Sequence, residues 1–460
     1  MLEKMALWVQ NHFIRSKRLN STRLVAQSFG MIILVGALLL TLPIASRDGQ
    51  SAGFFTGLFT ATSATCVTGL VIVDTWTQWT LFGQVVILGL IQLGGLGFMT
   101  VITLISFLFH RRIGLSERLI MVSTLNLNDL DGVVRVVRRA LMGTALFEAA
   151  GAVLMSIRLI PEFGLIKGVW HAVFHSVSAF CNAGFDLMGG ATGKYSSLSS
   201  FHADPVILLT TAALIIVGGL GFFVWEDIAR AKCWSALTLY TKLALVITGG
   251  LLLVGTLFFF LEEGDNPGTL GGMGFWEKLM NSFFQSTTLR TAGFNVIDQG
   301  AMRDNSQVFS CILMLVGGSS GSTAGGIKTV TAWVLIMVLI TGVVGGENIQ
   351  FRGRNLPLRR ALNAVTLFLM VLLLFVGGGM ILSLVDGVPF LHAAFETASA
   401  LGTVGVTVGI TEGLSRFSQG VLIALMYAGR VGVLSFSIAF LTRSKAAVKV
   451  KYPDFNIMIG

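Results

Sequence analysis

The sequence predicts an all-α, polytopic membrane protein built from four parallel repeats. Each repeat is expected to contain a first spanning helix, a pore helix and a second spanning helix, arranged with pseudo-fourfold symmetry around a central pore. Three observations lead to this prediction. Of the 460 residues, 54% are hydrophobic and only 12% are charged, which is more apolar side chain than a soluble core of this size buries. One short segment recurs four times, and clusters of basic residues alternate along the chain.

The recurring segment ends in a tetrad whose third residue is glycine. The copies read FTATSATCVTGL, FHSVSAFCNAGF, FFQSTTLRTAGF and FETASALGTVGV, and their glycines are Gly69, Gly184, Gly293 and Gly405, 109 to 115 residues apart. A phenylalanine stands ten residues before each glycine, and a serine or threonine stands six residues before it. Agreement in three columns of all four copies indicates a true internal repeat.

Each copy lies between two long apolar runs, such as residues 141–160 before the second copy and 205–225 after it. A helix of about ten residues before the glycine would reach about 15 Å, half of the hydrocarbon layer. The segment must therefore enter the membrane and return, so that each repeat crosses twice and all copies enter from the same side. We predict four units: residues 1–110, the N-terminal tail and repeat 1; 111–230, repeat 2; 231–350, repeat 3; and 351–460, repeat 4 and the C-terminal tail.

Basic residues mark the side of the membrane that faces the cytoplasm. Of the 32 lysines and arginines, 22 lie before residue 24 or within residues 111–139, 230–242, 352–360 and 443–451. This positive-inside pattern predicts a multi-pass cell-membrane protein with both termini in the cytoplasm, and it accounts for the net charge of +9 without a nucleic-acid partner. The first apolar run, residues 24–42, is interpreted as a retained helix rather than a signal peptide. On the opposite side of the membrane, acidic residues outnumber basic ones. This excess either attracts cations to the outer mouth of the pore or reflects only the tendency of acidic residues to avoid the inner side.

The tetrads have the composition of a backbone-lined pore. Non-helical backbone at membrane depth is tolerated only where it is buried in protein or lines water. Four half-helices followed by extended tetrads would surround an axis with carbonyl rings, which replace the water shell of a dehydrated cation, while the helix carboxyl ends disfavour anions. The alternative is that the small residues only let helices pack closely. The predicted filter segments are Val67, Thr68 and Gly69; Asn182, Ala183 and Gly184; Thr291, Ala292 and Gly293; and Thr403, Val404 and Gly405.

The chain resembles the KtrB-type, ion-translocating subunits of the Trk/Ktr/HKT superfamily of potassium transporters. The resemblance covers nearly the whole chain and is carried by SATCVTGL, IQLGGLGFMT, AFCNAGF, LRTAGFN, GSTAGGIKT, ETASALGTVGVT and the tail KYPD. It implies K⁺ as the transported ion, bound at the filter carbonyls, and Na⁺ as an activator. It also implies a homodimer and a cytosolic ring of nucleotide-binding regulatory subunits, with no further cofactor in this chain. A serine in the first filter goes with sodium-preferring members, so Gly69 favours potassium.

The stretch GGSSGSTAGGIKT, residues 317–329, interrupts an apolar run that extends from residue 309 to 344. Its free amides and carbonyls would be costly against lipid, so we expect it inside the protein, below the filter. Its place in the repeat and the family resemblance predict an intramembrane gate loop. A flexible kink is the plain alternative, and a phosphate-binding loop is disfavoured because Ile327 separates Gly326 from Lys328. The predicted gate residues are Gly317, Gly318, Ser319, Ser320, Gly321, Ser322, Thr323, Ala324, Gly325, Gly326 and Lys328, with Arg430 from repeat 4.

Three charged residues lie within the apolar runs, where charge is costly. Arg430 is expected to place positive charge near the gate loop as a barrier to ions, or else to form a structural ion pair. Arg290 is expected to support the third filter segment by bonding carbonyls behind it. Glu148 is expected to hydrogen-bond a neighbouring helix rather than to bind ions.

The sequence leaves other functional classes less well supported. Neither the four cysteines nor the six histidines form a metal-ligand or catalytic pattern, so an enzyme is not predicted. A symporter for an organic solute would be expected to show inverted repeats, whereas these repeats are parallel. Within the ion-transport class, a sodium-preferring or unselective monovalent cation uniporter remains the alternative to a potassium pathway.

Overall fold

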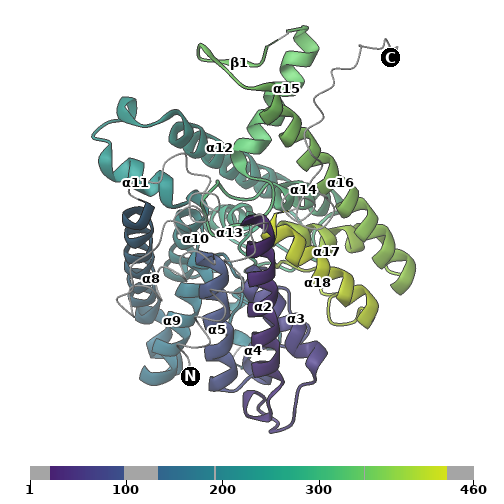
Figure 1. Ribbon diagram of the computed structural model, residues 1–460. Coiled ribbons are helices and arrows are strands. Elements are labelled where there is room, and N and C mark those ends of the chain that lie inside the picture. Colours follow the sequence, from purple (N-terminus) through teal and green to yellow (C-terminus); the bar gives the residue numbers. More distant parts are fainter. Residues whose placement is uncertain (1–20, 98–132, 191–192, 347, 433–460) are drawn as a thin grey trace, which may run out of the picture.

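The computed structural model describes residues 21–97, 133–190, 193–346 and 348–432 (Figure 1). The predictions for the two terminal tails, including the KYPD motif, fall outside these residues. The described chain is mainly helical, and its single small sheet pairs β1 (Gln350–Phe351) with β2 (Arg354–Asn355). The predicted all-α membrane fold is therefore confirmed in class, with one added hairpin at the end of the molecule opposite α4 (Thr75–Gln78) (Figure 1).

The same succession of helices recurs four times along the chain. A first helix is followed by a shorter helix, the predicted pore helix, which ends at a predicted filter segment, and then by a second helix. The four trios are α2 (Ser21–Thr41), α3 (Phe54–Cys66) and α5 (Leu81–Leu96); α8 (Val133–Phe163), α9 (Leu165–Cys181) and α10 (Pro205–Leu220); α12 (Leu239–Glu262), α13 (Phe275–Thr288) and α14 (Asp304–Leu315); and α16 (Leu358–Asp386), α17 (Phe390–Gly402) and α18 (Arg416–Val431).

Contacts between the trios run in a cycle. The second helix of each trio packs on the pore helix of the next: α5 on α9, α10 on α13, α14 on α17, and α18 on α3. The pore helices are the buried elements, because three of the four repeated phenylalanines, Phe59, Phe174 and Phe395, are fully buried. The first helices instead expose apolar side chains such as Leu253 and Leu373, at 63% and 73%, as expected of surfaces that face lipid.

The second helices are shorter than the apolar runs suggested. Only α12, α16 and the Val137–Phe163 part of α8 are long and apolar enough among the described helices to cross a membrane alone. The run 205–225 is not one helix, because α10 and α11 (Phe222–Arg230) meet at an angle of 92°. Gly221 lies at this break with φ +89°, a conformation that side-chain-bearing residues rarely adopt. The third trio is interrupted more widely, between α14 and α15 (Thr329–Val344).

The pore helices also differ from expectation in length. They contain 13 to 17 residues rather than about ten, because each begins well before the repeated phenylalanine. Among the described residues, four 3-10 turns lie in the connections between helices: η1 (Pro43–Ala45), η2 (Met188–Gly190), η3 (Ser199–Phe201) and η4 (Trp234–Ala236). After η3, Asp204 caps α10 by accepting from the amides of Val206 at 2.9 Å and Ile207 at 3.3 Å.

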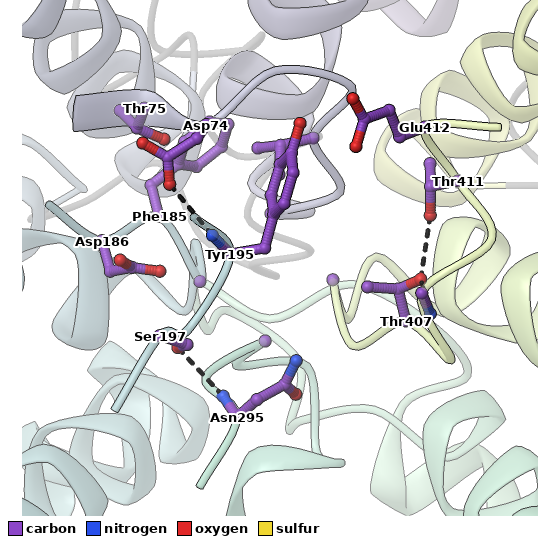
Figure 2. Close-up of a pocket in the computed structure, with 16 residues that line it drawn as sticks. Asp74, Thr75, Phe185, Asp186, Tyr195, Ser197, Asn295, Thr407, Thr411 and Glu412 are labelled. Atoms are coloured by element: carbon purple, nitrogen blue, oxygen red, sulfur yellow. Dashed lines mark hydrogen bonds between the residues drawn. The ribbon is translucent and has the colours of Figure 1, made fainter. Parts of the chain in front are cut away.

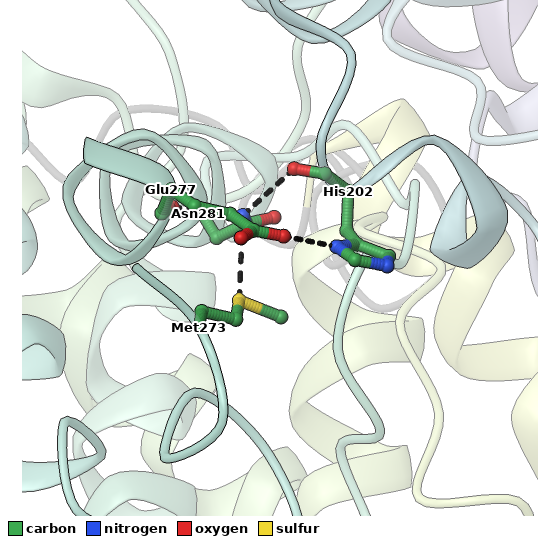
Figure 3. Close-up of polar contacts among 4 residues, drawn as sticks. All are labelled: His202, Met273, Glu277 and Asn281. Carbon is green, nitrogen blue, oxygen red and sulfur yellow. Dashed lines mark hydrogen bonds and ion pairs between the residues drawn. The ribbon is translucent and has the colours of Figure 1, made fainter. Parts of the chain in front are cut away.

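A polar contact fixes the loop of the second trio to the third pore helix (Figure 3). Asn281 of α13 is fully buried, and its amide nitrogen donates to the carbonyl oxygens of His202 at 2.9 Å and Glu277 at 2.8 Å. The imidazole of His202 contacts the Glu277 carboxylate in the first turn of the same helix. The trios are thus joined by hydrogen bonds as well as by apolar packing.

Candidate functional site

The four repeated glycines meet in the middle of the fold. An ideal Cβ built on Gly69 would lie 2.5 Å from the Ala183 carbonyl oxygen and 3.1 Å from the Cα of Gly184. One on Gly184 would lie 2.8 Å from the Ala292 oxygen and the Gly293 Cα alike. The cycle continues, because Gly293 faces the Val404 carbonyl and Gly405 faces the Thr68 carbonyl. Only glycine leaves room for the four chains to approach this closely.

The main-chain carbonyl oxygens beside the four glycines form a ring, and they accept no hydrogen bond from the described residues. Within the part of the chain that the structure describes, no hydrogen bond reaches the main-chain oxygens of Thr68, Ala183, Ala292 and Val404. All twelve predicted filter residues are buried. Buried carbonyls are almost always paired, so a set of four unpaired oxygens around one point is chemically suited to a cation.

The filter segments are not extended, contrary to the prediction. Their first residues, Val67, Asn182, Thr291 and Thr403, have φ between +53° and +68°, and the glycines have φ between +68° and +97°. Three of the pore helices end in this left-handed residue as a C-cap: the amide of Val67, for example, bonds the Ala64 carbonyl at 3.1 Å. β-Branched residues are strained in this conformation, so the surrounding packing must hold them there.

The repeated hydroxyl residue has a direct role in two of the segments. Ser63 Oγ accepts from the Gly69 amide at 3.0 Å, and Ser399 Oγ accepts from the Gly405 amide at 3.0 Å. In the third repeat the neighbouring Thr288 instead donates to the Phe294 carbonyl at 2.7 Å. The two serine bonds direct the amides of Gly69 and Gly405 back toward their pore helices.

A cavity of about 110 Å³ opens on the far side of the glycines from the gate loop (Figure 2). Figure 2 shows Asp74, Asp186, Tyr195 and Glu412 around it. Asp74 accepts from the Tyr195 amide at 3.1 Å, which fixes the loop that covers the cavity. In the loop that lines this cavity, burial raises the pKa of Asp186 to about 6, although the Met188 amide donates to its carboxylate. Burial and the Glu412 carboxylate raise the pKa of the Tyr195 hydroxyl.

The gate loop, residues 317–329, lies against the other end of the filter segments. It folds on itself where the Gly317 amide bonds the Ile327 carbonyl at 2.9 Å. It docks on the break in the second trio, where Ser319 N bonds the Gly219 carbonyl at 2.9 Å and Phe222 N bonds the Gly321 carbonyl at 3.0 Å. The structure thus brings the predicted gate residues next to the predicted filter residues.

Arg430 connects this loop to the first trio. Its guanidinium donates to the carbonyl oxygens of Thr323, of Gly94 at 2.5 Å and of Gly95 at 3.1 Å. No ion pair involves Arg430 among the described residues, so the structural ion pair considered as an alternative is absent there. Lys328 Nζ donates to the Ala324 carbonyl at 2.6 Å within the loop itself.

The predictions for the two other buried charged residues, Glu148 and Arg290, have different outcomes. Glu148 accepts from Gln92 Nε2 of α5 at 3.0 Å, so its predicted bond to a neighbouring helix is confirmed. The prediction for Arg290 is wrong in its partner, because the guanidinium donates to the hydroxyl of Thr248 on α12 at 3.4 Å rather than to carbonyls.

Sequence reasoning missed Glu396. This fully buried carboxylate of α17 accepts from the Thr411 hydroxyl at 2.7 Å and the Val408 amide at 3.2 Å, and it contacts the Thr407 hydroxyl. It therefore supports the wall of the outer cavity behind the fourth filter segment. A charged residue inside a repeated apolar segment was the signal that would have identified it.

Proteins similar to this chain are cation transporters. A family model, TrkH, described as a cation transport protein, matches residues 5–449. The potassium/sodium uptake protein NtpJ of Enterococcus hirae is 41% identical, with 96% of this chain and 98% of that protein covered. The Ktr system potassium uptake protein B of Bacillus subtilis is 38% identical, with 97% and 98% covered. The crystal structure of the potassium transporter TrkH from Vibrio parahaemolyticus matches the fold with a TM-score of 0.72 at 18% identity, over 93% of this chain and 86% of that one.

Proposed function

The chain belongs to the TrkH family of cation transport proteins, and on this basis we propose that it is the membrane-spanning, ion-translocating subunit of a potassium uptake system. The four filter segments select K⁺ through their main-chain oxygens, and the four trios surround the ion path with pseudo-fourfold symmetry. The gate loop, with Arg430, controls passage at the inner end. The protein itself carries out no covalent chemistry, in keeping with relatives that are named as uptake proteins.

The observation that carries this proposal is the ring of unpaired carbonyl oxygens beside Gly69, Gly184, Gly293 and Gly405. Carbonyl dipoles replace the hydration shell of a monovalent cation at little cost, and they offer nothing to an anion or an organic solute. The carboxyl ends of the pore helices add negative potential at the same point. The acidic side chains of the outer cavity, Asp74, Asp186 and Glu412, would raise the local cation concentration at its entrance.

The assembly is proposed from kinship. We expect a homodimer in the cell membrane, with both termini in the cytoplasm and a cytosolic ring of nucleotide-binding regulatory subunits on the inner face. The similarity to Ktr system proteins supports a partner-dependent system. Stimulation by Na⁺ is part of the same proposal.

A sodium-preferring or unselective cation uniporter is the second candidate, favoured by the name of the Enterococcus hirae relative, which includes both potassium and sodium. Uptake of radiolabelled Rb⁺ by cells that lack their own potassium uptake separates the two. Potassium selectivity predicts that K⁺ competes with Rb⁺ far better than Na⁺ does. Equal competition would favour the second candidate, and the absence of Rb⁺ or Na⁺ flux through folded protein in proteoliposomes would refute both.

A further inference from the structure

We propose that Asn182 transmits the position of the gate loop to the filter, so that cation preference depends on how the loop is docked. This inference rests on the function proposed above. The other filter segments begin with Val67, Thr291 and Thr403, so only the second begins with an amide side chain. Asparagine tolerates the left-handed conformation that this position requires, with φ +60°. Its amide is nevertheless fully buried, where each polar atom needs a partner.

One end of the Asn182 amide is bonded to the third filter segment. Nδ2 donates to the Thr291 hydroxyl at 3.3 Å and faces the Arg290 carbonyl at 3.5 Å. The space for this amide is provided by a glycine of α10: an ideal Cβ on Gly218 would lie 2.9 Å from Asn182 Oδ1. Asn182 therefore joins two neighbouring filter segments through side-chain bonds.

The other end of the amide is bonded to the gate loop. Thr323 Oγ1 lies 3.3 Å from Asn182 Oδ1 and 3.2 Å from the Phe180 carbonyl, the last turn of pore helix α9. A hydroxyl has one proton, so Thr323 shares it between these two acceptors. The same residue also bonds the Gly218 carbonyl through its amide at 3.4 Å, and its carbonyl accepts from Arg430.

Movement of the loop at Thr323 would therefore change the bonding of Asn182. A buried amide oxygen that loses its donor is unfavourable, so the side chain must turn or find another partner. Either response alters its bond to Thr291, in the next filter segment. Tyr240 provides a contrast: its hydroxyl holds the same loop through the Ser320 carbonyl at 2.8 Å and has no bond to a filter residue among those described.

Three variants test the coupling in purified protein reconstituted in proteoliposomes. Thr323→Val removes the hydroxyl at nearly constant volume, Thr323→Ser restores it, and Tyr240→Phe removes a hydroxyl bond from the loop at a different point. The assay measures the rate of Rb⁺ uptake and the concentration of Na⁺ that halves it. We expect Thr323→Val to change the Rb⁺-over-Na⁺ preference by about fivefold, the equivalent of one hydrogen bond. Thr323→Ser and Tyr240→Phe should stay within about twofold of the parent preference, whatever their rates.

Thr291→Val breaks the same chain of bonds on the other side of Asn182. It should shift the preference in the same direction, and the double variant with Thr323→Val should shift it no further than the larger single effect, since the two act through one amide. The coupling is overturned if both single variants keep the parental Rb⁺-over-Na⁺ preference or if Tyr240→Phe shifts this preference equally. It is also overturned if the effects of Thr323→Val and Thr291→Val add fully in the double variant. A parent that shows no preference among alkali cations would instead count against the proposed filter, so the two failures are distinguishable.

Discussion

Replacing Gly69 with serine should reduce the preference for K⁺ over Na⁺ by about tenfold, the equivalent of about 1.4 kcal/mol. The backbone at this position has φ +94°, which costs a side-chain-bearing residue about 1–2 kcal/mol. The new Cβ would also lie 2.5 Å from the Ala183 carbonyl oxygen. That oxygen belongs to the ring, so it must move by about 0.9 Å to restore ordinary van der Waals contact. The displaced oxygen then no longer lies at the same distance from the bound cation as the other three carbonyl oxygens.

The assay is competition between Rb⁺ and Na⁺ in proteoliposomes, with Gly53→Ser as the matched control. Gly53 lies in the same repeat with φ +84°, but no atom lies within 4 Å of its ideal Cβ. Both variants should therefore carry the same backbone strain, of the order of 1–2 kcal/mol, while only Gly69→Ser adds the overlap with the Ala183 carbonyl and changes the cation preference. If folded Gly69→Ser protein keeps the parental preference, or if Gly53→Ser shifts it equally, the filter assignment is wrong.

Three further predictions concern the two ends of the pathway. Because burial raises the pKa of Asp186 to about 6, this carboxylate loses its charge as the external pH falls from 7 to 5. The apparent affinity of the parent protein for Rb⁺ should therefore fall between pH 7 and pH 5, whereas the affinity of Asp186→Asn should not depend on pH in this range. Glu396→Gln removes a carboxylate oxygen that binds the hydroxyls of Thr407 and Thr411 in the cavity wall, and it should slow uptake by about tenfold in protein that still folds. Thr411→Val should give a smaller loss. Full activity in purified Glu396→Gln would refute the supporting role. Arg430→Gln removes bonds that hold the gate loop and should speed uptake and weaken its Na⁺ dependence; a variant that matches the parent in both would exclude the barrier role.

Periodic features of the sequence predicted the architecture because they repeat for a physical reason. Three of the four repeated phenylalanines are fully buried near the centre of the pore helices, and the repeated serine in repeats 1 and 4 binds the glycine amide six residues later. Both are short-range relations within one segment, so their spacing is visible in the chain. The glycine column marks the point where four backbones meet, which no other residue type permits.

Features that depend on tertiary contacts rather than on local spacing were not predictable in the same way. The partner of Arg290 is a threonine on another helix, 42 residues earlier in the chain, and nothing in the motif LRTAGF identifies it. The left-handed residue at the start of each filter segment was missed because valine and threonine normally disfavour that conformation. Tertiary packing overrides this preference, and the sequence carries no local sign of it. The bend at Gly221 was hidden by the continuity of the apolar run.

The third repeat differs from the others in one backbone contact, and it is the repeat that contains the predicted gate loop. In repeats 1, 2 and 4, a glycine of the second helix, Gly94, Gly218 or Gly429, lies directly against a carbonyl near the end of that repeat's own pore helix. In repeat 3 this contact is replaced by the gate loop, which reaches across to the second repeat and bonds the Gly219 carbonyl through Ser319. In repeats 1, 2 and 4 a backbone contact thus holds the second helix against its own pore helix, whereas in repeat 3 the loop is held by hydrogen bonds such as those of Ser319 and Thr323, each worth about 1 kcal/mol. Release of the loop would require these bonds to be broken or exchanged, and it would leave the backbone contacts of the other three repeats in place.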